Sequence, residues 1–366
     1  MGLPDIMIEF SKKAVVAVQS GFSGIVGIIL KDAKNNGALV LRGVDEIPAG
    51  DSAFSEANTA YIERAFMGAP SKVIVYTLPL EAQNYNEAFK YFSTVKVHYI
   101  CGAPDMTSEE ANAFVTWITG VRKNTVRRPV AVLPNVKADS KAVISFKVVN
   151  ATEDDKLEVD GVEFTEAEYC SRIAGLIAGL DLRYSSTFKP LNEVTMIPIA
   201  EDAEVDEAVE GGYLTLYNDG ERIVIARGVN SLTTVTEGET EDLKKIKILA
   251  IQDLIESDIY STINGSYVGN YSNSYDNKCL LITAIRGYLK GLEATEGGKG
   301  YLKAGSSNIE LDVAKQKQYL ESIGVDTSEM DQQTIKEANT GSKVFLKGSI
   351  SILDAIEDVS IFINKD

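Results

Sequence analysis

Three apolar runs decide the fold: Lys72-Val-Ile-Val-Tyr-Thr77, Val97-His-Tyr-Ile-Cys101 and Pro129-Val-Ala-Val-Leu133. Each run has the length of a strand, and the first is rich in β-branched residues. Helical patterns separate the runs, the first at residues 84–93 and the second after the capping box Thr107-Ser-Glu-Glu110. Strands that alternate with helices in this way are typical of βαβ units, so residues 72–133 predict a parallel sheet covered by helices on both faces.

The pattern extends toward both ends of the chain. Residues 14–41 contain three more apolar runs, and residues 52–67 have a helical pattern. On the other side, residues 157–164 predict a hairpin that turns at Asp160-Gly161, and residues 194–198 are expected to return to the parallel sheet. The large α/β domain therefore extends well beyond its central stretch.

A second capping box, Thr165-Glu-Ala-Glu168, predicts a helix with an unusual surface. This helix carries the small residues Ala174, Gly175, Ala178 and Gly179. A glycine inside a helix costs about 1 kcal/mol relative to alanine. Close packing against a sheet is the expected compensation.

The composition changes at residues 233–241 (TTVTEGETE), which we interpret as a linker. Two strongly apolar helical patterns follow, and Lys244, Lys245 and Lys247 are expected to form the solvated side of the first. A third, polar helix is predicted near residues 312–323 and carries Lys315 and Lys317. Alternating strand patterns end the chain.

Charge and composition exclude several functions. The chain has 36 Lys and Arg against 53 Asp and Glu, a formal net charge of −17, which disfavours nucleic-acid binding because phosphate contacts need surplus cations. No apolar run reaches the roughly 18 residues of a membrane span, and the start has no signal-peptide pattern. We therefore expect a soluble protein that binds neither nucleic acid nor membrane.

A search for catalytic chemistry finds little. His98 is the single histidine and lies in an apolar run, where a packed or edge histidine is expected. Cys101, Cys170 and Cys279 are far apart and are expected to be three buried thiols. Two glycine-rich stretches, residues 21–27 and 297–300, lack the spacing of a phosphate-binding loop and are interpreted as turns. No catalytic residue, metal ligand or cofactor is predicted.

Both ends of the chain carry short alternating strands. Ile6, Ile8 and Phe10 form the pattern at the start, and Val359, Ile361 and Ile363 form it at the end. Strands this short need a partner sheet. One alternative is that the two ends pair within one subunit, and the other is that each completes the sheet of a neighbouring copy by β-augmentation.

An ordered set of motifs in the second half resembles the contractile phage tail sheath proteins. Arg227-Gly-Val-Asn-Ser-Leu-Thr233 is similar to the RGVNTLT segment of that family, with Ser231 in place of Thr. Before it, Ala174 to Gly179 followed by Ser185-Ser-Thr187 resembles an AG..AG…S.T segment. After it, Lys244-Lys-Ile-Lys247 and Tyr267-Val-Gly269 match family helices and loops. The similarity covers about residues 165–366.

This resemblance implies a structural protein. It implies a subtilisin-like parallel-sheet domain without a catalytic triad, and an α+β carboxy-terminal domain that lies around a tail tube. The implied partners are other copies in stacked hexameric rings, the tube protein, and the baseplate and tail terminator proteins. The particle would assemble in the bacterial cytoplasm as the contractile tail of a phage or a phage-tail-like bacteriocin.

The resemblance also assigns roles to segments. It favours exchange of the strands at Ile6, Ile8, Phe10, Val359, Ile361 and Ile363 between subunits. It implies an arm at residues 1–20, the α/β domain at 21–235, the inner domain at 236–344 and the final strands at 345–366. Lys315 and Lys317 are expected to face the tube, with a merely solvated helix face as the alternative. Two other functions stay open at this point: an α/β enzyme, either a hydrolase or a nucleotide-dependent protein, and a non-contractile structural protein.

Overall fold

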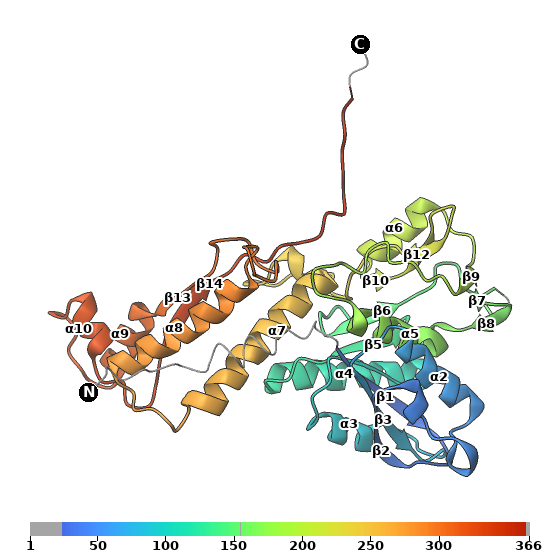
Figure 1. Cartoon of the computed structure of the whole chain (residues 1–366), viewed down its shortest axis with the longest axis horizontal. Coiled ribbons are helices and arrows are strands. Elements are labelled where there is room, and N and C mark those ends of the chain that lie inside the picture. Colours follow the sequence, from blue (N-terminus) through green and yellow to red (C-terminus); the bar gives the residue numbers. More distant parts are fainter. Residues whose placement is uncertain (1–23, 154, 364–366) are drawn as a thin grey trace. The chain divides into compact units, whose positions relative to one another are not determined.

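The computed structural model describes residues 24–153 and 155–363, and these residues form two compact units (Figure 1). The larger unit contains the described residues up to Asp253 together with those from Asp354 onward. The smaller unit contains Leu254–Leu353, and the division falls inside helix α7 (Ile246–Thr262). The four-part division that the sequence suggests stays a prediction.

The larger unit is built around a sheet that has seven strands in the described part of the chain, in the order β10-β6-β5-β4-β1-β3-β2. Every neighbouring pair in it is parallel except β2 with β3, which closes one edge antiparallel. The parallel sheet predicted from residues 72–133 is therefore confirmed. The strands are β1 (Ile25–Lys31), β2 (Gly37–Leu41), β3 (Lys72–Leu78), β4 (Tyr99–Cys101), β5 (Val130–Pro134), β6 (Val143–Phe146) and β10 (Tyr213–Leu214).

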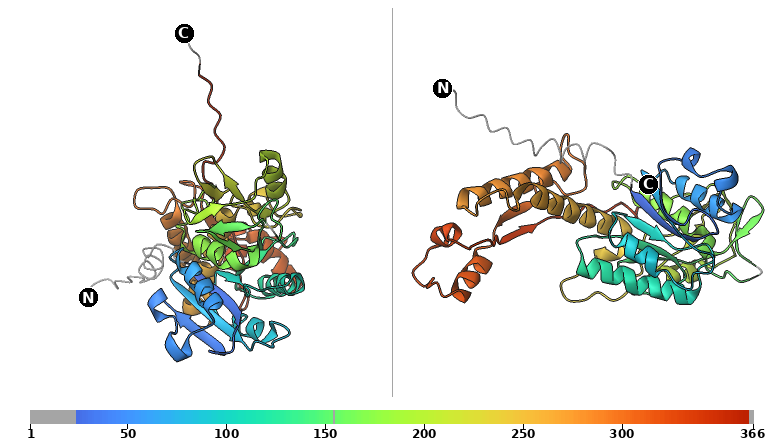
Figure 2. Two further views of the ribbon diagram at one scale, coloured as in Figure 1. Left: turned by 90° about the vertical axis from the view of Figure 1, so that its right-hand side faces the viewer. Right: turned by 90° about the horizontal axis from the view of Figure 1, so that it is seen from below.

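Helices cover both faces of this sheet because its strands are apolar on both sides. In β1, Val26, Ile28 and Leu30 enter one core, and Ile29 enters the other. The first core is closed by α2 (Glu56–Phe66) and α5 (Glu166–Gly179), and the second by α3 (Asn86–Phe92) and α4 (Ser108–Asn124). In the right-hand view of Figure 2, the blue α2 and the teal α4 lie on opposite sides of the strands.

Both predicted capping boxes are formed. Thr107 accepts a hydrogen bond from the Glu110 amide, and the Glu110 carboxylate accepts one from the Thr107 amide at 2.9 Å. Thr165 and Glu168 make the same reciprocal pair at the start of α5. Helices α4 and α5, which cover opposite faces of the sheet, thus begin where the sequence predicts.

Close packing of α5 against the turn after α2 explains its glycines. A Cβ at Gly175 would overlap the Ala65 carbonyl, and a Cβ at Gly179 would overlap the Gly68 carbonyl. Gly68 is equally constrained, because its Cβ would meet the backbone of Gly175. The two backbones therefore touch, but the glycines pack against α2 and the turn after it and not against a sheet as expected.

We expect Gly175→Ala to destabilise the larger unit. The added methyl must push the two helices apart, and overpacking of this kind costs about 1–3 kcal/mol. Gly120→Ala in α4 is the matched control, because a Cβ there meets nothing within 4 Å, and removing a helical glycine in open space stabilises by about 0.5–1 kcal/mol. Urea unfolding of both variants measures the difference, and equal midpoints would contradict the close-packing argument.

Several predictions in the larger unit are wrong. Gly24 and Gly27 do not form a turn: Gly24 donates its amide to the Ala178 carbonyl at 2.5 Å, and Gly27 lies inside β1. Residues 194–198 do not return to the main sheet. Their strand β9 (Val194–Met196) pairs antiparallel with β7 (Leu157–Val159). The other edge of β7 pairs with β8 (Val162–Phe164) in the predicted hairpin, so the three strands form a separate sheet.

The acidic stretch at residues 201–204 begins a helix. Glu201 and Glu204 form a capping box at the beginning of α6 (Asp202–Glu210). Negative charge at this end is favourable because it opposes the positive end of the helix dipole. The carboxylates therefore start a helix and are not available as a ligand set. The strand β6 was also not predicted.

The smaller unit combines the second half of α7 with a helical pair and a hairpin. In Figure 1, α8 (Tyr275–Leu292) runs beside the antiparallel strands β13 (Asn308–Leu311) and β14 (Leu346–Ser349). Helices α9 (Val313–Ser322) and α10 (Gln332–Glu337) lie between the two strands in sequence. Residues 297–300 form the predicted turn, with positive φ at Gly297 and Gly300.

The start of α7 differs from the prediction. A 3₁₀ turn over Glu241–Lys244 precedes it, and α7 itself begins at Ile246. Lys247 is not solvated: its exposed fraction is 7%, and burial lowers its pKa against the opposing effect of Asp354 and Glu357. Two of the three cysteines, Cys101 and Cys170, are buried as expected, whereas Cys279 is only half-buried.

His98 is a packed histidine. Its Nδ1 accepts a hydrogen bond from the Ile25 amide at 2.9 Å, which joins β1 to the residue before β4. Burial, with smaller contributions from Lys96 and Lys72, lowers its pKa to about 3. The imidazole is therefore neutral at pH 7, and its hydrogen bond to the Ile25 amide stabilises the sheet.

We expect His98 to make the protein less stable in mild acid. In the unfolded chain His98 is protonated below its ordinary pKa of 6.5, whereas in the folded chain it stays neutral down to about pH 3. The free energy of unfolding therefore falls as the pH falls through that window. The loss is at most about 1.4 kcal/mol per pH unit. His98→Asn keeps an acceptor but does not titrate. Its unfolding measured from pH 7 to pH 4 should show a flatter profile, and an unchanged slope would contradict the assignment.

Candidate functional site

The carboxy-terminal arm, residues 354–363, carries apolar side chains that are exposed to solvent. Val359, Ile361 and Ile363 are 69%, 74% and 82% exposed, and Figure 1 shows this stretch as an extended chain. None of the three belongs to a strand or helix among the described residues. Contiguous exposed apolar side chains mark an interaction site. The matching residues Ile6, Ile8 and Phe10 lie outside the residues that the structure describes.

The root of the arm is held on the larger unit by Glu357. Its Oε1 accepts hydrogen bonds from Ser185 Oγ at 2.8 Å and from Thr187 Oγ1 at 2.7 Å. Its Oε2 has no hydrogen-bond donor in range and faces Lys245 Nζ at 3.7 Å and Arg227 Nε at 3.8 Å. The side chain is only 6% exposed. We call Ser185, Thr187, Arg227 and Lys245 the arm socket.

Two more carboxylates flank this contact. Asp358 pairs with Arg227 at 2.5 Å, and Asp354 pairs with Lys245. Burial of Lys245 opposes its charge, but the hydrogen bond to Asp354 and the nearby Glu357 outweigh this effect and raise its pKa. The acidic root of the arm thus meets a complementary basic pair.

The RGVN motif holds the socket in place. The Gly228 amide donates to Thr187 Oγ1 at 3.0 Å, and the Gly228 carbonyl accepts from the Ile246 amide at 3.0 Å. A side chain at Gly228 would overlap Ser186 Oγ. Asn230 is fully buried and binds the Leu243 carbonyl through Nδ2 at 2.6 Å. The motif therefore joins the loop after α5 to the start of α7.

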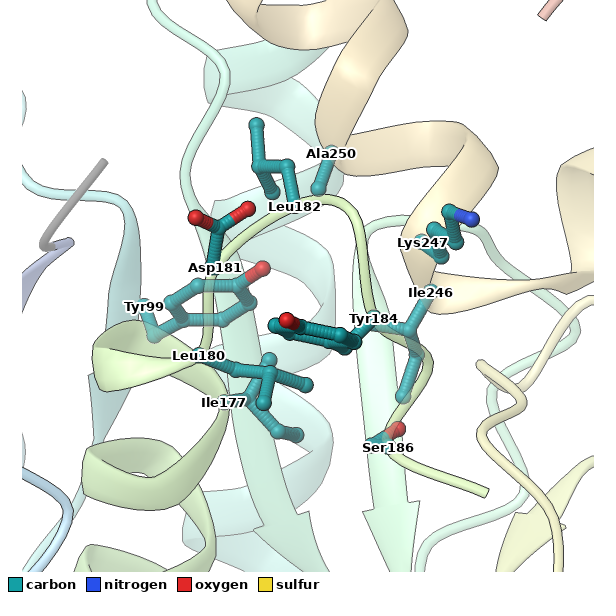
Figure 3. A pocket seen from close by; sticks show the side chains of 10 residues that line it. All are labelled: Tyr99, Ile177, Leu180, Asp181, Leu182, Tyr184, Ser186, Ile246, Lys247 and Ala250. Atoms are coloured by element: carbon teal, nitrogen blue, oxygen red, sulfur yellow. The ribbon is translucent and has the colours of Figure 1, made fainter. Parts of the chain in front are cut away.

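The seam between that loop and α7 is nearly solid. Figure 3 shows the side chains that surround the remaining space, including Tyr99, Tyr184 and Lys247. The cavity volume is about 10 Å³, which is the space of a single water molecule. This position cannot take a small-molecule ligand.

The crevice where open α/β proteins bind ligands is filled by the protein itself. That crevice lies at the carboxyl ends of β1 and β4, because β1 sits between β3 and β4. Lys31 pairs with Glu110 there at 2.5 Å, and Tyr61 donates to the Gly102 carbonyl at 2.9 Å. Asp32 accepts hydrogen bonds from the amides of Ser55 and Lys34 and from Asn58 Nδ2.

The other hollows and side-chain clusters among the described residues also lack a catalytic or metal-binding arrangement. An open hollow of about 610 Å³ near Pro104, Asn135 and Glu166 contains the capped starts of α4 and α5. No group of three His, Cys, Asp or Glu side chains suited to a metal ion occurs in residues 24–153 and 155–363. Each helix in the described part of the chain is too short or too polar to cross a bilayer.

Lys315 and Lys317 both lie on the exposed side of α9. Lys317 approaches Glu321 at 3.9 Å, a weak pair of two exposed side chains. Their expected role therefore stays a prediction.

The arm socket was not predicted from the sequence. The acids at residues 354–358 and the cations in the motifs are visible in the sequence, but nothing local pairs Glu357 with Ser185, 172 residues away. Only the order of the motifs pointed to this region.

Comparison with known proteins agrees with the fold and the motifs. Residues 79–231 match the family described as phage tail sheath protein central domain. The tail sheath protein of Clostridium phage phiCD119 is 38% identical over 368 residues, which covers 98% of each chain.

Two solved structures share the fold. A sheath tail protein from Desulfitobacterium hafniense is 15% identical with a TM-score of 0.68, covering 80% of this chain and 91% of that one. A chain in the baseplate of the anti-feeding prophage is 12% identical with a TM-score of 0.67, covering 94% of both chains. On the strength of the relative that spans nearly its whole length, this chain belongs to the phage tail sheath family, whose members are structural proteins of phage or phage-like particles and not enzymes.

Proposed function

We propose that this protein polymerises into a contractile sheath around a tail tube and drives the tube through a cell envelope. The observation that carries the proposal is the exposed apolar arm on a chain of the tail sheath family. Copies would stack as hexameric rings, with the tube, baseplate and tail terminator proteins as partners. The alternative of an α/β enzyme is excluded by the family, and a non-contractile structural protein is the remaining competitor.

We assign the larger unit to the subtilisin-like α/β folds as part of this proposal. Its parallel sheet with helices on both faces supports the assignment. The lone histidine is bound to the Ile25 amide and is neutral, so it cannot serve a Ser-His-Asp triad. Such a unit would contribute shape and contact surface only.

The arms would link subunits by β-augmentation. The hairpin of β13 and β14 is a two-stranded sheet with four residues in each strand, and an isolated pair of this size is marginally stable. Val359, Ile361 and Ile363 from one neighbour, and Ile6, Ile8 and Phe10 from another, would supply strands to such an edge. Each added backbone hydrogen bond contributes about 1 kcal/mol net.

Contraction would need no nucleotide. The extended polymer would be metastable, and closer packing of many identical subunits would release free energy at about 25 cal/mol per Å² of apolar surface buried. The net charge of −17 suits a large solvated outer surface. One similar structure is a six-fold symmetrised baseplate and another is a contracted state of the same particle, which supports both ring symmetry and contraction. Assembly would take place in the bacterial cytoplasm.

We expect the arms to be essential for polymerisation. Deleting residues 359–366, or residues 1–12, should leave folded monomers that form no sheath, because each removes a donated strand. Ile361→Asp should act in the same way, whereas Ser360→Asp is the matched control because alternate residues of a strand face opposite sides. Negative-stain electron microscopy and gel filtration read out polymers and monomers. Normal sheaths from the deletion variants would contradict strand exchange.

We also propose that Lys315 and Lys317 face the tube. The double variant Lys315→Glu with Lys317→Glu should still polymerise alone but should recover less tube on co-expression, since it reverses two charges on the proposed contact face and charge complementarity across an interface would be lost. Lys90→Glu with Lys123→Glu, two exposed positions of the larger unit, makes the same charge change elsewhere. Tube protein in pelleted sheaths measures the effect. Equal tube recovery in the two double variants would assign the α9 lysines to solvent.

A further inference from the structure

We propose that Glu357 is the positioning residue of the carboxy-terminal arm, and that the arm socket exists to fix where the donated strand begins. The inference rests on the proposed exchange of arms between copies. It assigns to Ser185, Thr187 and Arg227, three residues of the family motifs, a common role in assembly. The partner is a second copy of this chain.

The neighbouring carboxylates Glu357 and Asp358 differ sharply in burial. Glu357 is 6% exposed and accepts two hydroxyl hydrogen bonds, whereas Asp358 is 82% exposed and makes one ion pair. A carboxylate is expensive to bury, and a buried ion pair adds little net stability over an apolar contact. In some proteins a buried ionic group specifies a unique geometry. Glu357 therefore serves position more than stability.

The socket groups are held by contacts that do not involve the arm. Thr187 Oγ1 is held by the Gly228 amide, and Ser185 Oγ contacts Thr187 Oγ1 at 3.0 Å. Lys245 directly precedes α7, whose first amide is bound by Gly228. These groups come from three separate segments of one compact unit. Because their positions are set by the fold, the arm docks into a rigid site.

The anchor changes the cost of strand exchange. A strand that is anchored at Glu357 loses less conformational entropy on pairing than one that is attached only at Leu353. Preorganisation therefore strengthens assembly without new contacts. Residues 359–363 in extended form would span about 17 Å from this point. The accepting edge in the neighbouring copy must then start close to the socket, which fixes register as well as affinity.

A spin label tests the anchor in the free, full-length monomer. Ile356→Cys places the label beside Glu357 at a position that is 89% exposed, in a Cys279→Ser background that leaves only the buried Cys101 and Cys170. Glu357→Ala should raise the detached fraction roughly tenfold or more, since hydrogen bonds to a charged group are lost. The spectrum should then show a mobile label. Asp358→Asn removes the same charge from the exposed neighbour and should leave the label immobile.

Assembly gives the second readout. Glu357→Ala monomers should fold normally, because Arg227 and Lys245 are 37% and 31% exposed and keep Asp358 and Asp354 as partners, but should form shorter or fewer sheaths. If Glu357→Ala fails to fold, Ser185→Ala with Thr187→Ala removes the neutral donors and should mobilise the label in the same way.

The outcomes separate this inference from the proposed function. A label that is equally mobile in wild type, or equally immobile after both substitutions, overturns the anchor while leaving strand exchange intact. A mobile label with undiminished sheath assembly overturns the positioning role. Normal sheaths from the deletion of residues 359–366 overturn the exchange itself, whatever the label shows.

Discussion

The backbone contact between α5 and the end of α2 is the constraint on which the larger unit depends. Gly68, Gly175 and Gly179 leave no room for side chains at this crossing. The helix can then lie flat on the sheet, with Ile173, Ala174 and Ile177 buried against it. Its last turn leads directly into the loop that carries Ser185 and Thr187, so the position of the helix also sets the position of the arm socket.

A second feature of the described residues is the set of internal contacts at the carboxyl ends of β1 and β4. In an open α/β sheet the crevice at the reversal of strand order is the natural site for a substrate or nucleotide. Here an ion pair, a tyrosine hydroxyl and a fully hydrogen-bonded Asp32 occupy it. The side chains at this position bond within the protein, in agreement with membership of a structural family.

Rigid and exposed parts are divided sharply at Glu357. On one side of it, hydroxyls and cations on fixed elements hold the chain, and on the other side Val359, Ile361 and Ile363 are left in solvent. In the proposed contractile polymer, each link must stay attached both to its own subunit and to its neighbour. The buried carboxylate of Glu357 would provide the first attachment, and the exposed apolar residues after it would provide the second.

The sequence by itself determined the elements whose causes are local. Apolar runs predicted β3, β4 and β5, capping-box residues predicted the starts of α4 and α5, and the single histidine in an apolar run argued against a catalytic triad. The motif order indicated the family. Tertiary structure decided the rest: that β9 leaves the main sheet for β7, that Lys247 is buried, and that Glu357 meets residues 112 to 172 positions earlier in the chain. The physical reason is that hydrogen bonds within a turn or helix depend on neighbours in sequence, whereas the partner of a strand edge or of a buried charge is chosen only when distant segments pack together.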